Sequence, residues 1–242
     1  MSLFLITMIS VPIFAQKDFE KDIVKTTSGD LIMTFIGHGT LMFEFNGLII
    51  HIDPVMSEAD YAKLPDADII LVTHEHGDHL DMNAIKHILK DDCQVIMTPA
   101  CLNNLEDFKS GVVMKNGDSK NIKSILIEAI PAYNIEHKRP GGEPFHPKGQ
   151  GNGYILTLGN LRVLVAGDTE NTPEIKELKN IDIAFLPMNL PYTMTPEMVA
   201  DAAQSFRPKI LYPYHYGNSN TDELVELLKS EKDIEVRIRN LQ

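Results

Sequence analysis

Apolar and mixed side chains alternate over residues 31–36 and 41–45, which is the period of a β-strand with one buried face. The Asn46-Gly47 pair that follows is a strong signal for a two-residue hairpin. It leads into a third apolar run at 48–54, so this part of the chain is predicted to form an antiparallel meander. The charged stretch before the meander, residues 16–29, is predicted to be a short linker or an edge segment.

The rest of the pattern predicts strands that alternate with short helices. Apolar runs between turn residues predict strands at 69–72, 94–98, 112–115, 124–130, 154–158, 161–166, 181–186, 209–212 and 235–239. Helical spacing behind capping residues predicts helices at 81–90, 101–108, 172–178, 195–206 and 222–228. Helices that follow strands, after an antiparallel start, indicate mixed α/β layers.

Three histidines and two acids stand directly after the strand at 69–72, in the sequence His74-Glu75-His76-Gly77-Asp78-His79. In an extended chain residues i and i+2 point the same way, so His74 and His76 can aim at one point. A turn at Gly77 lets Asp78 and His79 face a second point nearby. Such a pair of donor sets is half of a two-metal site.

The order His74-x-His76-x-Asp78-His79 resembles the HxHxDH signature of the metallo-β-lactamase superfamily. Gly167-Asp168-Thr169 after one strand and His215 after another follow in the order of that family, so the resemblance covers roughly residues 30–220. It implies an α/β fold of the α+β type, a four-layer αββα sandwich with the metal cleft at one edge between the sheets. The turn at 37–40 and the strand end at 52–54 are similar to those of the branch that contains the ascorbate-6-phosphate lactonases.

The resemblance also implies a ligand set for two divalent cations. The first ion would be held by His74, His76 and His146, the second by Asp78, His79 and His215, and Asp168 would bridge them. His137 is the alternative to His146, since both lie in the segment before the next strand. Nitrogen and oxygen donors suit zinc, with manganese or iron as alternatives. His38 and Asp53 either border this cleft or have structural roles at strand ends, where Asp53 could orient a metal-bound histidine.

Two ions held in this way can share a hydroxide, because binding lowers the pKa of water to about 7. We therefore predict a dinuclear hydrolase of a small ester, lactone or phosphodiester, in which Asp78 has a catalytic role in steering the proton of the water. An RNA-processing metallo-nuclease and a non-catalytic metal-binding protein are the alternatives. The loops at 131–153 and 187–194 should wall the cleft, and the residues expected to touch substrate there or nearby are Tyr133, Asn134, Tyr192, Met194 and Tyr216.

Composition narrows the class of protein and the partners. The 242 residues suit one domain at 16–242, and 43% hydrophobic content is ordinary for a soluble protein with a sizeable core. A net charge of −12, with scattered basic residues, argues against nucleic acid as a partner and leaves a small molecule. Two cysteines, Cys93 and Cys101, are too few for a disulfide framework.

The first residues resemble a secretory signal peptide. Residues 3–15 are apolar and uncharged, and the charged segment begins abruptly after Ala15 and Gln16. We predict a signal at 1–15 and export to the periplasm or the medium, with a cytoplasmic protein that buries an N-terminal strand as the alternative. The apolar stretch is too short to span a bilayer, so no stable membrane insertion is expected.

Overall fold

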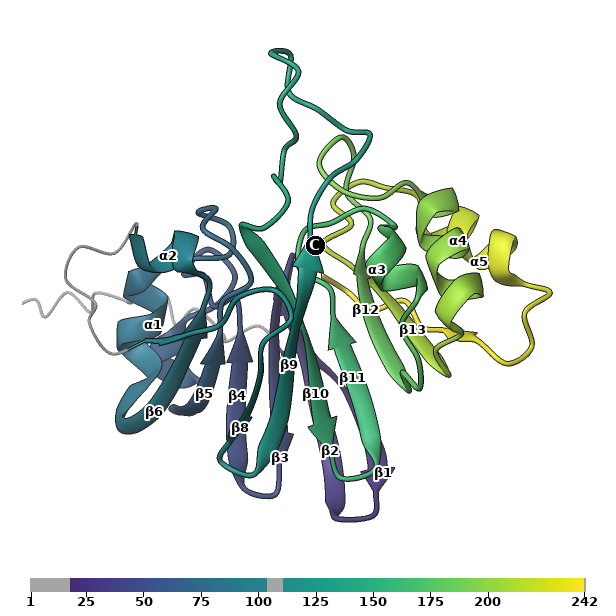
Figure 1. The fold of residues 1–242 in the computed structure, drawn as a ribbon. Helices are drawn as coiled ribbons and strands as arrows, with labels where there is room; N and C mark the ends of the chain where they lie inside the picture. Colours follow the sequence, from purple (N-terminus) through teal and green to yellow (C-terminus); the bar gives the residue numbers. More distant parts are fainter. Residues whose placement is uncertain (1–17, 104–110, 242) are drawn as a thin grey trace, which may run out of the picture.

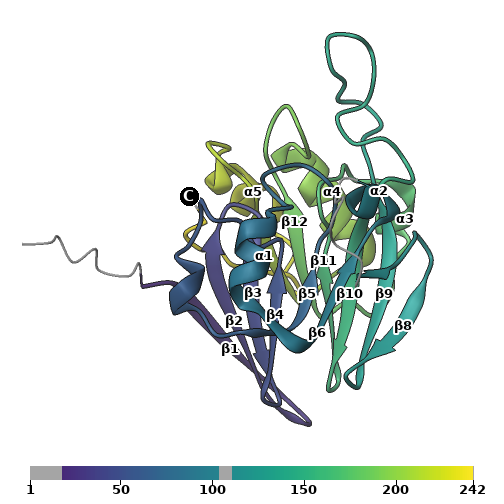
Figure 2. The ribbon, with the colours of Figure 1, turned by 90° about the vertical axis from the view of Figure 1, so that its left-hand side faces the viewer.

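Two seven-stranded β-sheets packed face to face form the centre of the molecule, and helices cover both outer faces (Figures 1 and 2). The structure is a computed structural model that describes residues 18–103 and 111–241. The predicted αββα sandwich is therefore confirmed. The predicted signal at 1–15 lies outside the described residues.

The first sheet follows the chain in order from β1 to β7. Strands β1 to β4 are antiparallel and β4 to β7 are parallel. Its strands are β1 (Glu20–Thr26), β2 (Gly29–Gly37), β3 (Thr40–Phe45), β4 (Leu48–Ile52), β5 (Ala67–Leu71), β6 (Leu89–Met97) and β7 (Val112–Val113). Its helices are η1 (Tyr61–Lys63), α1 (Met82–Ile88) and α2 (Pro99–Asn103).

The second sheet repeats this plan, with the antiparallel strands β8 to β11 followed by the parallel strands β11 to β14. Its strands are β8 (Ser119–Ile122), β9 (Ile125–Ala132), β10 (Gly151–Leu158), β11 (Leu161–Val165), β12 (Ile183–Pro187), β13 (Ile210–Tyr214) and β14 (Glu235–Val236). Its helices are α3 (Pro173–Lys176), α4 (Pro196–Phe206) and α5 (Thr221–Leu228). Strands followed by helices, in mixed α/β layers, were predicted from the sequence.

Strand β5 shows how the layers are held together. All five of its residues are buried, because alternate side chains serve two cores. Ile69 and Leu71 belong to the large core between the sheets, whereas Ile70 packs with Ile85 and Ile88 of α1 in a separate core on the outer face. A run of consecutive apolar residues is what a strand buried on both faces requires.

Several predicted boundaries were wrong for identifiable reasons. The helix predicted at 81–90 ends at Ile88, because Leu89 already pairs with Ala67 in the sheet. Of the two alternatives for residues 16–29, the structure shows the edge segment, as strand β1, whereas the polar strand β8 was not predicted at all. Residues 151–153 were assigned to a loop but start β10, where a Cβ on Gly153 would lie 2.7 Å from the carbonyl oxygen of Ala166. Glycine is present there to allow close backbone contact.

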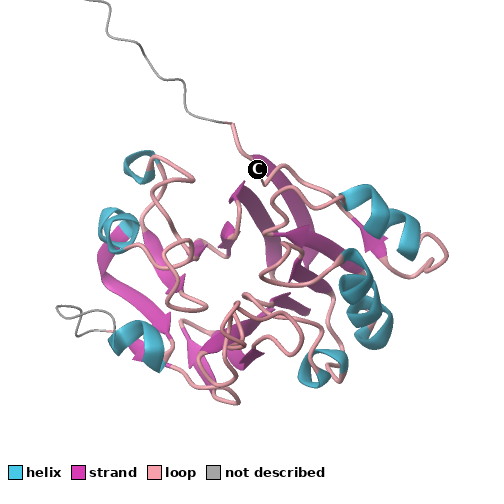
Figure 3. Cartoon of the chain, turned by 90° about the horizontal axis from the view of Figure 1, so that it is seen from above, coloured by secondary structure: helices cyan, strands magenta, loops and turns pink. Residues whose placement is uncertain are grey.

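None of the helices within residues 18–103 and 111–241 is long and apolar enough to cross a bilayer. The loops at the carboxyl ends of the parallel strands collect on one side of the sandwich. Seen from that side, they fill the middle of the molecule between the two outer groups of helices (Figure 3). This arrangement brings loops from both sheets to one place.

His51 in β4 is fully buried, and its Nε2 lies 3.0 Å from the carbonyl oxygen of Pro65. Burial lowers the pKa of His51 from 6.5 to about 4. Between pH 6.5 and 4 the unfolded chain therefore carries a proton on His51 that the folded protein lacks. The stability that this histidine contributes above pH 6.5 is lost as the pH falls to 4. We expect this residue to account for about 3 kcal/mol of the lost unfolding free energy.

Urea unfolding of the wild type and of His51→Gln at pH 7, 5 and 4 measures this contribution. The glutamine can still donate to Pro65 but does not titrate, so its stability should fall less steeply with pH. The exposed His87→Gln variant is the control and should keep the wild-type slope. Equal slopes for all three proteins would contradict the expectation.

Candidate metal centre

Strands from both sheets deliver the predicted ligands to one edge of the sandwich. His74, His76, Asp78 and His79 lie in the loop between β5 and α1, whereas Asp168 and His215 follow the ends of β11 and β13. These three strands belong to the parallel parts of the sheets, whose carboxyl ends meet at the same edge. His146 comes from the long loop between β9 and β10.

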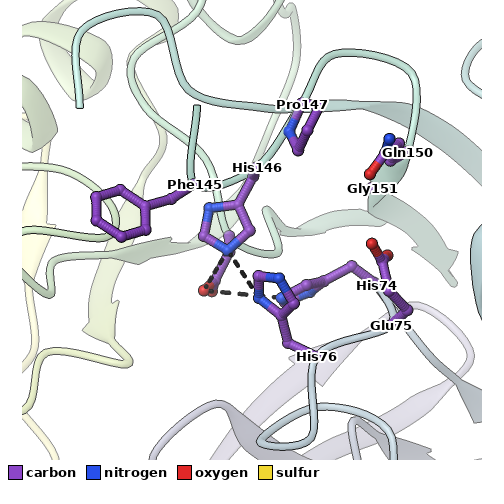
Figure 4. Close-up of a pocket in the computed structure, with 9 residues that line it drawn as sticks. His74, Glu75, His76, Phe145, His146, Pro147, Gln150 and Gly151 are labelled. Atoms are coloured by element: carbon purple, nitrogen blue, oxygen red, sulfur yellow. Dashed lines mark hydrogen bonds and ion pairs between the residues drawn. The ribbon is translucent and has the colours of Figure 1, made fainter. Parts of the chain in front are cut away.

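The first group of donors consists of His74, His76 and His146. Figure 4 shows the rings of His76 and His146 turned toward each other, with 3.2 Å between Nδ1 of His76 and Nε2 of His146. The ring centroid of His74 lies 4.7 Å from that of His76 and 5.0 Å from that of His146. The ligand atoms of the three histidines lie within 4.8 Å of one another, which is close enough to hold one cation.

Asp168 connects this group to a second one. One of its oxygens, Oδ2, lies 3.3 Å from Nε2 of His146 and 3.5 Å from Nε2 of His215. The other, Oδ1, lies 3.4 Å from Nε2 of His79. Asp78 completes the second group, with 3.6 Å between its Oδ2 and Nε2 of His215. All seven predicted side chains are thus brought together, with the Asp168 carboxylate in the middle.

Several buried atoms at the centre lack a hydrogen-bond partner in the described part of the chain. They include Nε2 of His74 and His79, both ring nitrogens of His215 and Oδ1 of Asp168. An unpaired buried polar atom costs free energy, and native proteins usually satisfy such groups. Imidazole nitrogens and carboxylate oxygens are donors that zinc, manganese and iron accept. The residues present therefore fit divalent cations.

The histidines also keep the carboxylates ionised. Burial by itself would raise the pKa of Asp168, but the nearby imidazoles of His215 and His79 outweigh it and hold the pKa well below 3.8. Burial opposes ionisation of Asp78 as well, and the nearby imidazoles of His215 and His38 outweigh it and lower its pKa. Both carboxylates are in the charged form that binds cations.

Asp53, at the end of β4, positions His79. Its Oδ2 accepts a hydrogen bond from Nδ1 of His79 over 2.8 Å, and both of its oxygens bond Thr73, one to the backbone N–H and one to the hydroxyl, at 2.7 Å. Because Nδ1 of His79 is engaged in this way, Nε2 is left to face Asp168. Of the two interpretations open for Asp53, the structure supports the orienting one.

A buried carboxylate that the sequence analysis missed holds His146 in place. Asn134 accepts hydrogen bonds from the backbone N–H and from Nδ1 of His146 at 2.9 and 2.7 Å. The amide of Asn134 in turn donates to Glu170, which also accepts from three successive backbone N–H groups, those of residues 135–137, at 2.7 Å each. His137, the alternative ligand, bonds Glu170 through Nδ1 and is absent from the donor groups. In the sequence, the only indication of this role is that Glu170 directly follows the Gly167-Asp168-Thr169 motif.

His38 borders the same centre. Its Nε2 lies 3.4 Å from Oδ2 of Asp78, and its ring centroid is 3.8 Å from that of His215. The turn is tight: His38 has a φ of 48°, and a Cβ on Gly39 would lie 2.8 Å from the ring of His79. His38, Asp78 and His215 form a further group that could hold a cation.

Comparison with known proteins identifies the family to which this chain belongs. The chain matches the Beta-lactamase superfamily domain over residues 32–215. It is 31% identical over 192 residues to a UPF0173 metal-dependent hydrolase of Thermococcus kodakarensis, which covers 75% of this chain and 83% of that protein. The chain belongs to the UPF0173 family of the metallo-β-lactamase superfamily. It is a metal-dependent hydrolase.

Solved structures agree with this assignment. A candidate metal-dependent hydrolase from Parabacteroides distasonis superposes with a TM-score of 0.87 at 51% identity, and the match covers 93% of this chain and 100% of that chain. A metallo hydrolase from Ignicoccus hospitalis gives a TM-score of 0.72 at 22% identity over 87% of this chain and 95% of that chain, which shows the shared fold. The similarity to ascorbate-6-phosphate lactonases stays a prediction.

A cavity of about 460 Å³ opens beside the metal centre of this UPF0173 hydrolase. The predicted ligands that line it are His76, Asp78, His146, Asp168 and His215. Its other walls are formed by His38, Gly77, Arg139, Phe145, Asn189 and Tyr192. A smaller space shares His76, Phe145, His146 and Asp168 with it and is also lined by Glu75, Pro147 and Gln150 among others (Figure 4).

Of the five residues predicted to touch substrate, Tyr192 lines the large cavity. The other four line neither of these two cavities and have other contacts. Met194 is fully buried in the core, and the hydroxyl groups of Tyr133 and Tyr216 donate to Glu174 and to the carbonyl of Arg239. Asn134 supports His146, so its polar side chain is used for positioning.

Proposed function

We propose that this protein is a dinuclear metal-dependent hydrolase that cleaves a small ester, lactone or phosphodiester. One observation carries the proposal: seven His and Asp side chains from both sheets converge, with unpaired ligand atoms, beside a cavity of about 460 Å³. That volume is within the usual range for small-molecule sites. Hydrolysis of a small molecule therefore fits both the donors and the space next to them.

In this proposal His74, His76 and His146 hold one cation, and Asp78, His79 and His215 hold the other. Asp168 lies between the two sets, with an oxygen directed to each. The cations would activate water near neutral pH and polarise the substrate oxygen. Zinc suits the donor set, and manganese or iron would also be accepted.

Asp78 has a second role in the proposal. Its side chain is 50% exposed and lines the cavity, whereas that of Asp168 is 3% exposed. Oδ2 of Asp78 lies within 3.6 Å of both His38 and His215, which keep it ionised. An ionised carboxylate at the cavity wall can accept a hydrogen bond from the attacking water and so steer its proton. Asp78 is therefore the group to which we assign this catalytic step.

The walls of the cavity favour a small molecule over RNA. A nucleic-acid groove requires a row of Lys and Arg side chains along the phosphate backbone. The lining of this cavity includes a single one, Arg139. The net charge of −12 would also repel a polyanion such as RNA.

Elemental analysis and a substrate panel test the proposal together. We expect about two metal ions per chain in the purified protein, and a chelator should abolish hydrolysis and lower the melting temperature, because metal binding stabilises the folded state. The panel compares a lactone, p-nitrophenyl esters and bis-p-nitrophenyl phosphate. Full activity after removal of both metals would contradict the metal requirement, and one tightly bound ion in a fully active protein would contradict the dinuclear site.

A further inference from the structure

We propose that the natural substrate carries a negatively charged group and an apolar group apart from the bond that is cleaved. In this proposal Arg139 binds the anion, and Phe145 and Tyr192 bind the apolar part. The inference rests on the proposed function, because it concerns the same cavity. It adds the chemical class of the substrate.

Arg139 is presented by an ordered part of the long loop between β9 and β10. The backbone N–H of Arg139 donates to the carbonyl of Glu143 over 2.7 Å, and a β-bridge joins Lys138 to Pro144. The resulting arm stands above the edge of the sandwich (Figure 1). Its base is attached through the hydrogen bonds that Glu170 accepts. The guanidinium is therefore carried by a hairpin with its own hydrogen bonds.

The cation and two aromatic rings form a continuous row in the cavity. Cζ of Arg139 lies 5.1 Å from the centroid of the Phe145 ring, a cation–π arrangement. Phe145 in turn meets Tyr192 edge to face, with 5.1 Å between the ring centroids and 80° between the planes. All three side chains line the cavity that contains His146 and Asp168. One ligand can therefore contact the row and the metal centre at the same time.

Arg139 is available to bind an anion. It takes part in none of the salt bridges that the described residues form, although the chain has twelve more acidic than basic residues. Its one side-chain hydrogen bond, to the carbonyl of Phe145, is long at 3.4 Å. A planar guanidinium can bind a carboxylate or a phosphate through two parallel hydrogen bonds.

The two loops that carry this row also expose apolar side chains next to residues of the site, Ile135 beside Asn134 and Leu190 beside Asn189. Ile135, Leu190 and Tyr192 are 47%, 46% and 45% exposed. The two loops are joined by a hydrogen bond of 2.9 Å from the amide of Asn134 to the carbonyl of Tyr192. Large exposed apolar groups at a cavity often mark a binding surface. They favour an acyl or aryl group over a sugar as the second part of the substrate.

Two esters of similar length test the anion requirement in the metal-loaded protein. Mono-p-nitrophenyl glutarate carries a terminal carboxylate, and p-nitrophenyl butyrate is neutral. Arg139→Ala should lower kcat/KM for the glutarate ester about tenfold and leave the butyrate ester within about twofold. Arg139→Lys, which keeps the charge but not the planar fork, should give an intermediate loss. Lys138→Ala is the matched control, since it removes a neighbouring exposed cation that does not line the cavity.

A binding measurement separates this inference from the proposed reaction. Calorimetric titration with 4-phenylbutyrate and with 4-phenyl-1-butanol compares an anionic and a neutral apolar ligand. Arg139→Ala should weaken binding of the acid about tenfold and leave the alcohol unchanged, and Phe145→Leu should weaken both. An acid held by the metals alone would bind the wild type and Arg139→Ala equally, and that result overturns the inference. Arg139-dependent binding without turnover of any ester, lactone or phosphodiester in the substrate panel would contradict the proposed reaction only.

Discussion

Asp168→Asn should reduce kcat/KM by about 10³-fold or more and lower the metal content of the purified protein. In the proposed site, Asp168 is the one residue with oxygens directed at both sets of donors, toward His146 on one side and His79 on the other. An amide keeps the shape but presents one neutral oxygen and two N–H donors. Metal-assisted hydrolysis supplies several kcal/mol of transition-state stabilisation, which corresponds to the expected loss of rate.

Steady-state kinetics on bis-p-nitrophenyl phosphate or an ester, together with elemental analysis, measures both effects. Asp201→Asn is the control, because Asp201 is an exposed aspartate that pairs with Lys176. It should keep the wild-type rate and metal content. An Asp168→Asn protein with two metals and a normal rate would show that Asp168 does not bridge the ions.

Glu170→Gln should weaken metal binding at the first site by 10- to 100-fold and destabilise the protein by about 3 kcal/mol. One oxygen of Glu170 accepts from Asn134 and from the backbone and ring nitrogens of His137, and the other accepts from residues 135 and 136. Whichever way the amide of a glutamine is turned, its NH₂ group faces at least two N–H donors. Asn134 would then lose its support and misplace His146.

Competition with a metal-binding dye gives the two metal affinities, and urea unfolding gives the stability. Glu174→Gln is the matched control, since Glu174 lies four residues away on the same segment and accepts from the Tyr133 hydroxyl and from Lys148. It should change stability by less than about 1 kcal/mol and leave metal affinity unchanged. If Glu170→Gln lost stability but kept full affinity at both sites, the role in positioning His146 would be wrong.

The residue pattern alone was sufficient for mixed α/β layers and for the group of donors at 74–79, whereas the sandwich was implied by the resemblance to a known family. Spacing in the chain controls which way neighbouring side chains point, so His74, His76, Asp78 and His79 could be placed on a strand end and a turn without coordinates. The apolar run at 69–72 showed in the same way that a buried strand precedes them. Both inferences are local, and local geometry follows directly from the order of the residues.

Strand boundaries were less accessible, because they depend on partners. Ser119–Ile122 is polar and becomes a strand by pairing with Ile125–Ala132, and Leu89 leaves its helix because it pairs with Ala67. Gly153 was assigned to a loop because its close backbone contact with Ala166 cannot be read from the sequence. These contacts join positions distant in the sequence, so no periodicity in the segment itself records them.

The tertiary structure alone decided how the centre is held and what shape the cavity has. The sequence identified Asp168 and His215 through their position in a motif, and it left His146 and His137 as alternatives. Only the fold showed that Asn134 and Glu170 direct His146 to the centre and keep His137 away from it. It also showed that Met194 is buried in the core and that Arg139 and Phe145 line the cavity. A side chain on a long loop has no fixed direction until other segments bind that loop, so its role is a property of the folded molecule.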